Sequence, residues 1–178
     1  VWSSNNWFHK LIDSLIDYVV DILEMQANAG ADVLMIFDSW AHMIPSFFWK
    51  DFGISPTKKI INNLRKRNIL IPIIGFPFKA GSSLINYSFE SGVDCLALDW
   101  TVDLNWAIKN INPNIVIQGN LDPASLIDNN NNLDKSVKLI LDTMNNKRHI
   151  FNVGHGLTPE CKIENIKKVI EIVKNYNN

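Results

Sequence analysis

The chain contains a short unit that is written out twice in succession. Cys95–Leu98 is an apolar run that ends in the polar stretch 99–101, and residues 104–111 follow with helical spacing. A second apolar run, Ile115–Ile117, ends in the polar stretch 118–120. Apolar runs of this length that alternate with helices predict parallel strands buried on both faces. The pattern therefore predicts an α/β protein, and in a β/α barrel the polar ends of such strands face the active site.

The same alternation extends over the whole chain. Gly30 and Gly92 follow helical stretches, as glycine commonly does at a helix C-terminus, and Asp122-Pro123 has the capping carboxylate and early proline of a helix start. The expected strands are 31–37, 70–74, 95–98, 115–117 and 149–153, and the expected helices are 7–29, 55–67, 82–90, 104–111, one opening at 122–123, 133–144 and 158–176.

These five strands and their helices form one expected domain, residues 1–178, because no low-complexity linker or charge run divides the chain. Right-handed crossovers would build either an open doubly wound sheet or most of an eight-stranded barrel. An open sheet usually carries a glycine-rich phosphate loop. The sequence has neither GxGxxG nor GxxxxGK[ST].

Composition excludes several functions. The 178 residues carry a net charge of -1, which does not suggest a surface for nucleic acid or a membrane. No apolar run approaches the roughly 20 residues of a membrane span. Cys95 and Cys161 are far apart and are expected to be reduced thiols, which indicates a cytoplasmic protein. The start at Val1, without an initiator Met or a signal-peptide pattern, suggests a piece of a longer chain.

Phe37-Asp38-Ser39-Trp40 places an aromatic, a carboxylate and a hydroxyl at the end of the first expected strand. Ser39 lacks the flanking glycines of a GxSxG nucleophile elbow, so a hydrolytic nucleophile is not expected. Asp38 has two interpretations of equal weight, a functional carboxylate or a cap or rim hydrogen bond.

Two further strand ends are candidates for function. In Gln118-Gly119-Asn120, glycine allows another group to approach the backbone closely, although Asn120 could instead bond its own loop in a tight turn. In Gly154-His155-Gly156, the flanking glycines suggest an imidazole presented to a cleft, where it could bind anions or move protons.

The histidines show no HExxH spacing and no pairing with cysteine, so no metal site is expected. Aromatic side chains gather instead at or near the expected strand ends, where they could pack in the core or form an apolar wall for a flat ligand. They are Phe37, Trp40, Phe76, Phe78 and Trp100.

Taken together and in order, the strand-end motifs resemble those of the uroporphyrinogen decarboxylase family. The motifs are 37–41 (FDSWA), 98–102 (LDWTV), 118–123 (QGNLDP) and 152–156 (NVGHG), and 73–77 (IIGFP) resembles the bacterial form of the intervening strand. The resemblance covers essentially the whole chain. It implies a (β/α)8 TIM-barrel fold of which this chain holds about strands 4–8, the C-terminal part of a single barrel domain.

The resemblance also implies an activity. The family removes the carboxyl groups of the four acetate side chains of uroporphyrinogen III to give coproporphyrinogen III on the path to haem, as a homodimer without metal or organic cofactor. A pyrrole protonated at carbon acts as an electron sink when the acetate loses CO2. A porphyrinogen is therefore the expected partner, with no nucleic acid and no membrane.

Carried over by position, Ser39 matches the family serine that contacts a substrate carboxylate. His155 matches the histidine that contacts substrate and has been considered as the proton donor, and Phe37 matches an apolar cleft residue. Asp38, Gln118 and Asn120 are motif members with a supporting role. His42 stands where the family usually has glycine, and Phe78-Lys79 interrupts a stretch that is often basic and rich in glycine.

The family's N-terminal arginines, its central aspartate beneath the pyrroles and its cleft tyrosine precede the part that matches. Two alternatives to an enzyme segment therefore stay open: a truncated, non-catalytic gene product, and a related barrel methyltransferase. The second would carry a zinc-binding His-x-Cys, and no His lies two residues before Cys95 or Cys161.

Two expectations follow for the structure. Ser39, Gln118 and His155 should surround one cleft, because the ends of barrel strands share a rim. The three arginines, Arg65, Arg67 and Arg148, should lie away from the strand ends, which leaves Lys79 as the only nearby cation and the chain alone inactive.

Overall fold

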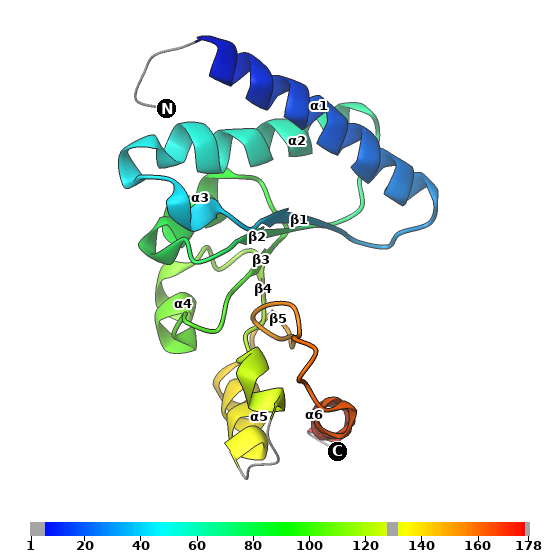
Figure 1. Ribbon diagram of the computed structural model, residues 1–178, viewed down its shortest axis with the longest axis vertical. Helices are drawn as coiled ribbons and strands as arrows, with labels where there is room; N and C mark the ends of the chain where they lie inside the picture. Colours follow the sequence, from blue (N-terminus) through cyan, green and yellow to red (C-terminus); the bar gives the residue numbers. More distant parts are fainter. Residues whose placement is uncertain (1–5, 128–131, 177–178) are drawn as a thin grey trace. The chain divides into compact units, whose positions relative to one another are not determined.

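The computed structural model describes residues 6–127 and 132–176 (Figure 1). Within these residues, five parallel strands alternate with helices, and neighbouring strands follow chain order, β1-β2-β3-β4-β5. The chain divides into two compact units, residues 1–95 and 96–178, and β3 (Cys95–Ala97) is the strand in which the first ends and the second begins. Successive βα units produce a strand order of this kind, so the predicted α/β architecture is confirmed.

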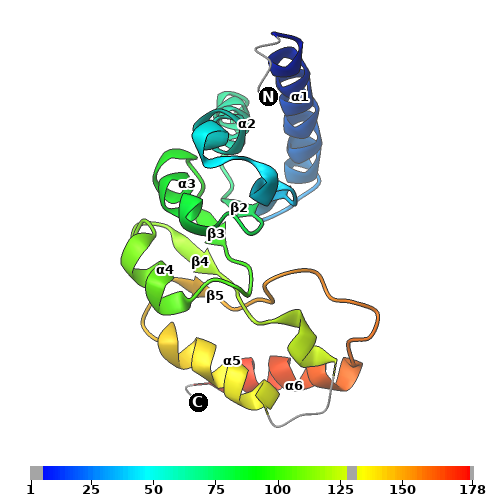
Figure 2. The ribbon, with the colours of Figure 1, turned by 60° about the vertical axis from the view of Figure 1, so that its left-hand side comes forward.

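The first unit contains two long helices that lie side by side (Figures 1 and 2). Both helices bury apolar side chains. Those of the first helix, α1, are Ile16, Val20 and Leu23, and those of the second, α2, are Ile60, Ile61 and Leu64. Its elements are α1 (Asn6–Asn28), β1 (Leu34–Asp38), α2 (Ser55–Lys66), β2 (Ile73–Pro77) and α3 (Leu84–Glu90), with short helical turns η1 (Ala41–Met43), η2 (Ser46–Phe48), the π-helix η3 (Lys50–Ile54) and η4 (Gly81–Ser83).

The second expected strand was placed three residues too early. Leu70 is 73% exposed, whereas all five residues of β2 are buried, and the ladder to β1 begins with Ile73 opposite Leu34. Gly75 lies beyond the expected strand end at residue 74 but is inside β2. A Cβ there would meet the Tyr87 hydroxyl at 2.5 Å, so this glycine makes room for α3 and does not form a turn.

In the second unit α5 and α6 lie side by side (Figure 2). Asp103 caps α4 by accepting a hydrogen bond from the Trp106 backbone N–H at 2.7 Å, as N-cap aspartates commonly do. The elements are α4 (Leu104–Asn110), β4 (Val116–Gln118), the 3₁₀ helix η5 (Pro123–Leu126), α5 (Asn132–Thr143), β5 (His149–Ile150) and α6 (Ile163–Lys174).

Three boundaries here differ by more than one residue from the sequence expectation. β5 ends at Ile150, whereas the expected strand ran to Val153. Asp122 does cap the expected start, but the helix it opens is the short η5. The last helix begins at Ile163, not at Thr158-Pro159. The Lys162 backbone N–H donates to the Leu126 carbonyl at 3.0 Å, and the buried Asn165 side chain donates to the same oxygen at 3.0 Å. These tertiary contacts fix the start of α6, which the proline signal alone could not locate.

Across the described residues, no helix has both the length and the apolar character that a membrane span requires.

Candidate functional site

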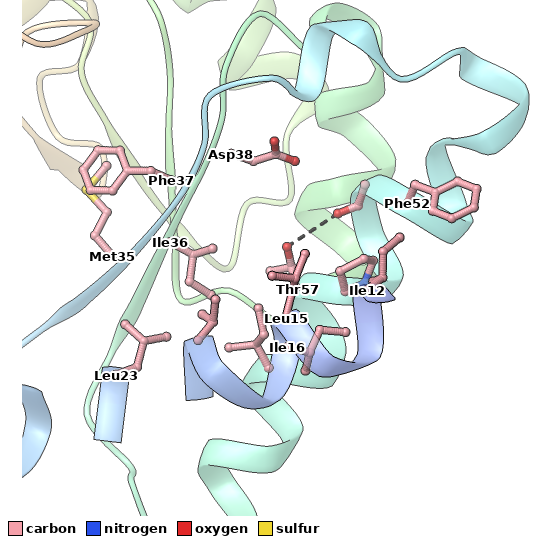
Figure 3. A pocket seen from close by; sticks show the side chains of 14 residues that line it. Ile12, Leu15, Ile16, Leu23, Met35, Ile36, Phe37, Asp38, Phe52 and Thr57 are labelled. Atoms are coloured by element: carbon pink, nitrogen blue, oxygen red, sulfur yellow. Dashed lines mark hydrogen bonds between the residues drawn. The ribbon is translucent and has the colours of Figure 1, made fainter. Parts of the chain in front are cut away.

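The C-terminal end of β1 carries three of the predicted site residues. Figure 3 shows Phe37 and Asp38 pointing to opposite sides of the strand, as consecutive strand residues do. The Phe37 side chain is 65% exposed and contacts Phe76 edge-to-face at 6.0 Å between ring centroids. Ser39 follows directly and is exposed. Ser39 and the phenyl ring of Phe37 are therefore open to a ligand, whereas the Asp38 side chain is half-buried on the other side of the strand.

Asp38 lies on a largely apolar cavity of about 390 Å³ that is bounded by α1, β1, η3 and α2 (Figure 3). Burial in these surroundings raises the pKa of Asp38, and a hydrogen bond from the Trp40 backbone and the charge of His42 oppose the shift. The hydrogen bond from the Trp40 backbone agrees with one of the two interpretations of Asp38, the one that gives it a cap or rim hydrogen bond. The other polar side chain of the cavity, Thr57, directs its Oγ1 to the Gly53 carbonyl at 3.5 Å.

Aromatic rings connect the ends of β1 and β2. Phe76 contacts Phe78 at 5.9 Å, Phe78 contacts His42 at 6.0 Å, and His42 contacts Trp40 at 5.8 Å between ring centroids. The Lys79 ammonium lies 5.2 Å from the centroid of the Phe78 ring, within cation–π range. The predicted gathering of aromatics at strand ends is confirmed for these two strands. Lys79 brings positive charge to the group.

At the end of β4, Asn120 is buried and holds a neighbouring loop. Its Nδ2 donates to the Asp99 carbonyl at 2.9 Å and to the Val102 carbonyl at 2.8 Å. The carboxylate of Asp99 accepts hydrogen bonds from the backbone N–H and the hydroxyl of Thr101. Asn120 thus holds the loop after β3, and both of these hydrogen bonds leave its own loop.

Gln118 is buried in β4, and its backbone carbonyl accepts a hydrogen bond from the backbone N–H of Leu98 at 2.9 Å. At Gly119, which has φ +125°, a Cβ would lie 2.8 Å from the Leu98 carbonyl oxygen. Glycine at this position thus makes room for the backbone that follows β3.

His155 is exposed and meets the Trp100 ring edge-to-face at 6.1 Å between centroids. The two flanking glycines differ. A Cβ on Gly154 would lie 2.4 Å from the Trp100 backbone nitrogen, whereas a Cβ on Gly156 would meet nothing within 4 Å. Gly154 is thus required for the loop to pack on the chain after β3, and this packing places His155 beside Trp100.

Sequence reasoning overlooked His149, which it considered only as a metal ligand. The ring Nε2 lies 2.6 Å from the Gly119 carbonyl oxygen. Burial lowers the pKa of His149, and the bond to Gly119 opposes the shift. Only the pairing of β5 with β4, in which His149 stands opposite Ile117, brings this imidazole to the end of β4. The sequence contained no signal for it.

The arginines lie where they were expected, away from the strand ends. Arg65 donates to the carbonyls of Ile69 and Ile71 at 2.7 and 2.9 Å and pairs with Asp94 at 3.1 Å. The two carbonyls precede the start of β2, and Asp94 precedes the start of β3. Arg148 donates to the Asn114 carbonyl, which precedes β4. Arg67 pairs with two acidic residues of α1 at 2.6 Å. Each guanidinium therefore supports the fold at a distance from the strand-end motifs of its own unit.

Ser39 belongs to the first unit and Gln118 and His155 to the second. Their convergence on a single cleft therefore stays a prediction. Within residues 6–127 and 132–176, no three His, Cys, Asp or Glu side chains are grouped as metal ligands would be.

Residues 1–176 match the protein family described as Uroporphyrinogen decarboxylase (URO-D). Among curated proteins, a uroporphyrinogen decarboxylase of Orientia tsutsugamushi (strain Ikeda) is 39% identical over 178 residues, which covers 98% of this chain and 52% of the relative. One of Cereibacter sphaeroides (strain ATCC 17025) is 38% identical over 168 residues, covering 94% and 49%. The chain spans about half the length of the curated relatives it matches.

Solved structures share the fold at low identity. A methyltransferase from Methanosarcina mazei superimposes with a TM-score of 0.78 at 15% identity and covers 92% of this chain and 48% of its own. A putative vitamin-B12 independent methionine synthase from Listeria monocytogenes gives a TM-score of 0.62 at 13% identity, covering 93% and 54%. Both likenesses concern the fold alone.

Proposed function

The chain belongs to the uroporphyrinogen decarboxylase family, and from this premise we propose that it forms the C-terminal part of an enzyme that converts uroporphyrinogen III to coproporphyrinogen III. The observation that carries the proposal is the family match over residues 1–176, which includes every strand-end motif. The whole enzyme would remove one carboxyl group from each of four acetate side chains.

The chemistry assigns a task to each exposed strand-end side chain. Loss of CO2 from an acetate needs an electron sink, and a pyrrole protonated at carbon provides one. A proton must then be returned to the methylene carbon that has lost its carboxyl group. His155 is the proposed proton donor, because its imidazole is exposed, is oriented against Trp100, and belongs to a residue type that gains and loses protons near neutral pH.

Ser39 and Phe37 are the proposed substrate contacts. The exposed hydroxyl of Ser39 can donate a hydrogen bond to a substrate carboxylate, and the exposed ring of Phe37 can cover an apolar pyrrole face. Asp38, Gln118 and Asn120 support these contacts from buried or half-buried positions. In this proposal Ser39, Gln118 and His155 surround one cleft of a single barrel domain in the whole protein.

The same family membership supports the remaining proposals. The whole protein would act in the cytoplasm as a homodimer, on a porphyrinogen, without metal or organic cofactor. The 178-residue chain by itself would be inactive, since the guanidinium groups of its arginines bond to carbonyls and acidic residues away from the strand ends. A substrate with eight carboxylates cannot be desolvated without more cationic partners.

The test uses a chimaera in which this chain replaces the matched part of the Orientia tsutsugamushi relative. The chimaera and the isolated chain are each incubated with uroporphyrinogen III under anaerobic conditions, and products with seven to four carboxyl groups are separated by chromatography. We expect turnover by the chimaera only. Loss of a preorganised polar contact typically costs about 10²-fold, so Ser39→Ala and His155→Ala should each lower the turnover of the chimaera strongly.

Gly156→Ala is the matched control in the same loop, because a Cβ there meets no neighbour within 4 Å. An inactive chimaera that folds as the parent does would refute the proposed function. Turnover by the isolated chain near that of the parent would refute the argument from the arginines.

A further inference from the structure

The loop after β2 holds a lysine in a backbone conformation that lysine rarely adopts. Lys79 has φ +53° and is the third residue of a tight turn, which the Ala80 N–H closes by donating to the Pro77 carbonyl at 3.4 Å. A turn with a positive φ at this position is normally built with glycine or asparagine. Costly backbone conformations of this kind recur at ligand sites. The chain therefore keeps a cation here against the preference of the turn.

The same turn is fixed to the end of β1. The Phe78 N–H donates to the Asp38 carbonyl at 3.0 Å, which continues the hydrogen bonding between β1 and β2 beyond the ladder. The Lys79 ammonium lies 5.2 Å from the centroid of the Phe78 ring. Because this bond fixes Phe78, the ammonium beside its ring is held near the C-terminal ends of both strands, where Ser39 also lies.

Two rings from the loop after β1 complete a group of four side chains. The imidazole of His42 meets the Phe78 ring edge-to-face at 6.0 Å and lies 5.8 Å from the Trp40 ring, both between centroids. Trp40 is 72% exposed, and His42 and Lys79 are also exposed. All four residues belong to the first unit. We call Trp40, His42, Phe78 and Lys79 the cationic-aromatic cluster.

The cationic-aromatic cluster offers what a carboxylate carried on an apolar ring requires. The Lys79 ammonium and a ring N–H of His42 can both donate to a carboxylate, and hydrogen bonds between ionised groups are the strong ones. The rings of Trp40 and Phe78 can cover the carbon atoms that carry the carboxylate. A porphyrinogen combines both parts, because its pyrrole rings bear acetate and propionate arms.

The chemistry of decarboxylation decides between the two kinds of arm. An acetate that loses CO2 gives up the charge of its carboxylate in the transition state, so a cation bound to that carboxylate would stabilise the ground state and slow the step. A propionate keeps its carboxylate from substrate to product. The ammonium of Lys79 therefore suits a propionate, which it can hold throughout the reaction.

We propose that the cationic-aromatic cluster is a subsite for one propionate arm of the porphyrinogen. Lys79 and His42 bind the carboxylate, and Trp40 and Phe78 cover the pyrrole that carries it. The inference rests on the proposed function, of which it names one subsite.

The test uses coproporphyrinogen III as an inhibitor of uroporphyrinogen III turnover by the same chimaera under anaerobic conditions. Coproporphyrinogen III retains the four propionates and has lost every acetate carboxylate, so its binding reports on propionate subsites. Lys79→Gln should weaken this inhibition and raise the KM for uroporphyrinogen III, each by about three- to tenfold. A raised KM with unchanged inhibition would overturn the proposal, because the cluster would then hold an acetate.

Lys66→Gln is the matched control. Lys66 is an exposed lysine in the last turn of α2, outside the cationic-aromatic cluster and away from the strand ends. The same change of charge at this position should alter neither the inhibition nor the KM. Equal effects of the two substitutions would overturn the subsite, since they would reflect the net charge of the protein alone.

Lys79→Gly separates ligand binding from a role in the fold. Glycine adopts φ +53° at little cost, so this change should raise the urea midpoint of the isolated chain while it weakens inhibition of the chimaera as Lys79→Gln does. A lower midpoint would overturn the proposal, because lysine would then be kept to stabilise the turn.

A fluorescence titration of the chimaera with coproporphyrin III needs no turnover and keeps the two proposals apart. An inactive chimaera that binds coproporphyrin III, and binds it more weakly as Lys79→Gln, would refute the proposed function and support the subsite. An active chimaera whose binding is unchanged by Lys79→Gln would overturn the subsite alone. Absence of binding by the chimaera would also overturn the subsite.

Discussion

Replacement of Gly154 by alanine tests whether close packing positions the His155 loop. The new Cβ would lie 2.4 Å from the Trp100 nitrogen and 3.0 Å from both the Asp99 carbonyl carbon and the Trp100 Cα. These are backbone atoms and cannot rotate away. An ordinary contact needs about 3.4 Å or more, so the loop must move by roughly 1 Å, and overpacking of this kind typically costs about 1–3 kcal/mol.

The shift would also weaken a short hydrogen bond, because the Gly154 N–H donates to the Leu121 carbonyl at 2.7 Å. We expect Gly154→Ala to lower the free energy of unfolding of the 178-residue chain by about 2–3 kcal/mol, since net hydrogen bonds contribute about 1 kcal/mol. Urea unfolding followed by circular dichroism measures this as a lower midpoint with an unchanged slope.

Gly156→Ala is the control for the same chemical change two residues away. Nothing lies within 4 Å of its Cβ, so its effect should stay within about 0.5 kcal/mol or be slightly stabilising. In the chimaera, Gly154→Ala should also reduce turnover, because His155 moves away from Trp100. Equal unfolding midpoints for the two variants would refute the reasoning, since the contact with Trp100 would then place no limit on the loop.

Three further predictions concern buried polar groups. In the folded chain, a thiol reagent should modify Cys161 quickly and Cys95 only after unfolding, because burial, with a smaller effect from the charge of Asp94, raises the pKa of Cys95 to about 12. Two fast thiols in the native chain would contradict this. The pKa of His149 is lower in the folded chain than in the unfolded chain, so as the pH falls the unfolded chain binds the proton at a higher pH. The free energy of unfolding should therefore fall as the pH drops below the usual pKa of 6.5. His149→Gln should remove this part of the loss between pH 7.5 and 5.5, as measured by urea unfolding, and an unaltered pH dependence would count against it. Asn165→Ala should cost about 1 kcal/mol by the same assay, because the Leu126 carbonyl at the end of η5 loses one of its two donors and keeps the Lys162 N–H. A change below about 0.5 kcal/mol would show that this bond does not hold α6.

Local chemistry made much of the fold predictable. The spacing of apolar residues and Gly30, which has φ +99°, were enough to place α1 within a residue of its observed ends. The apolar run at Cys95 and the polar residues after it placed β3 equally well. Such signals depend on residues a few positions apart, so they are legible without the rest of the chain. The order of the strand-end motifs likewise identified the family before any contact was known.

Contacts between distant residues decided the rest. β2 begins at Ile73 because its ladder to β1 and the Tyr87 side chain determine which residues are buried, and α6 begins at Ile163 because Asn165 bonds η5. The burial of His149 depends on its place opposite Ile117. The sequence by itself determined which side chains stand at strand ends, because that follows from local periodicity. Only the tertiary structure decided which of them are exposed and which hold the backbone, because desolvation and close packing arise between segments that the sequence leaves far apart.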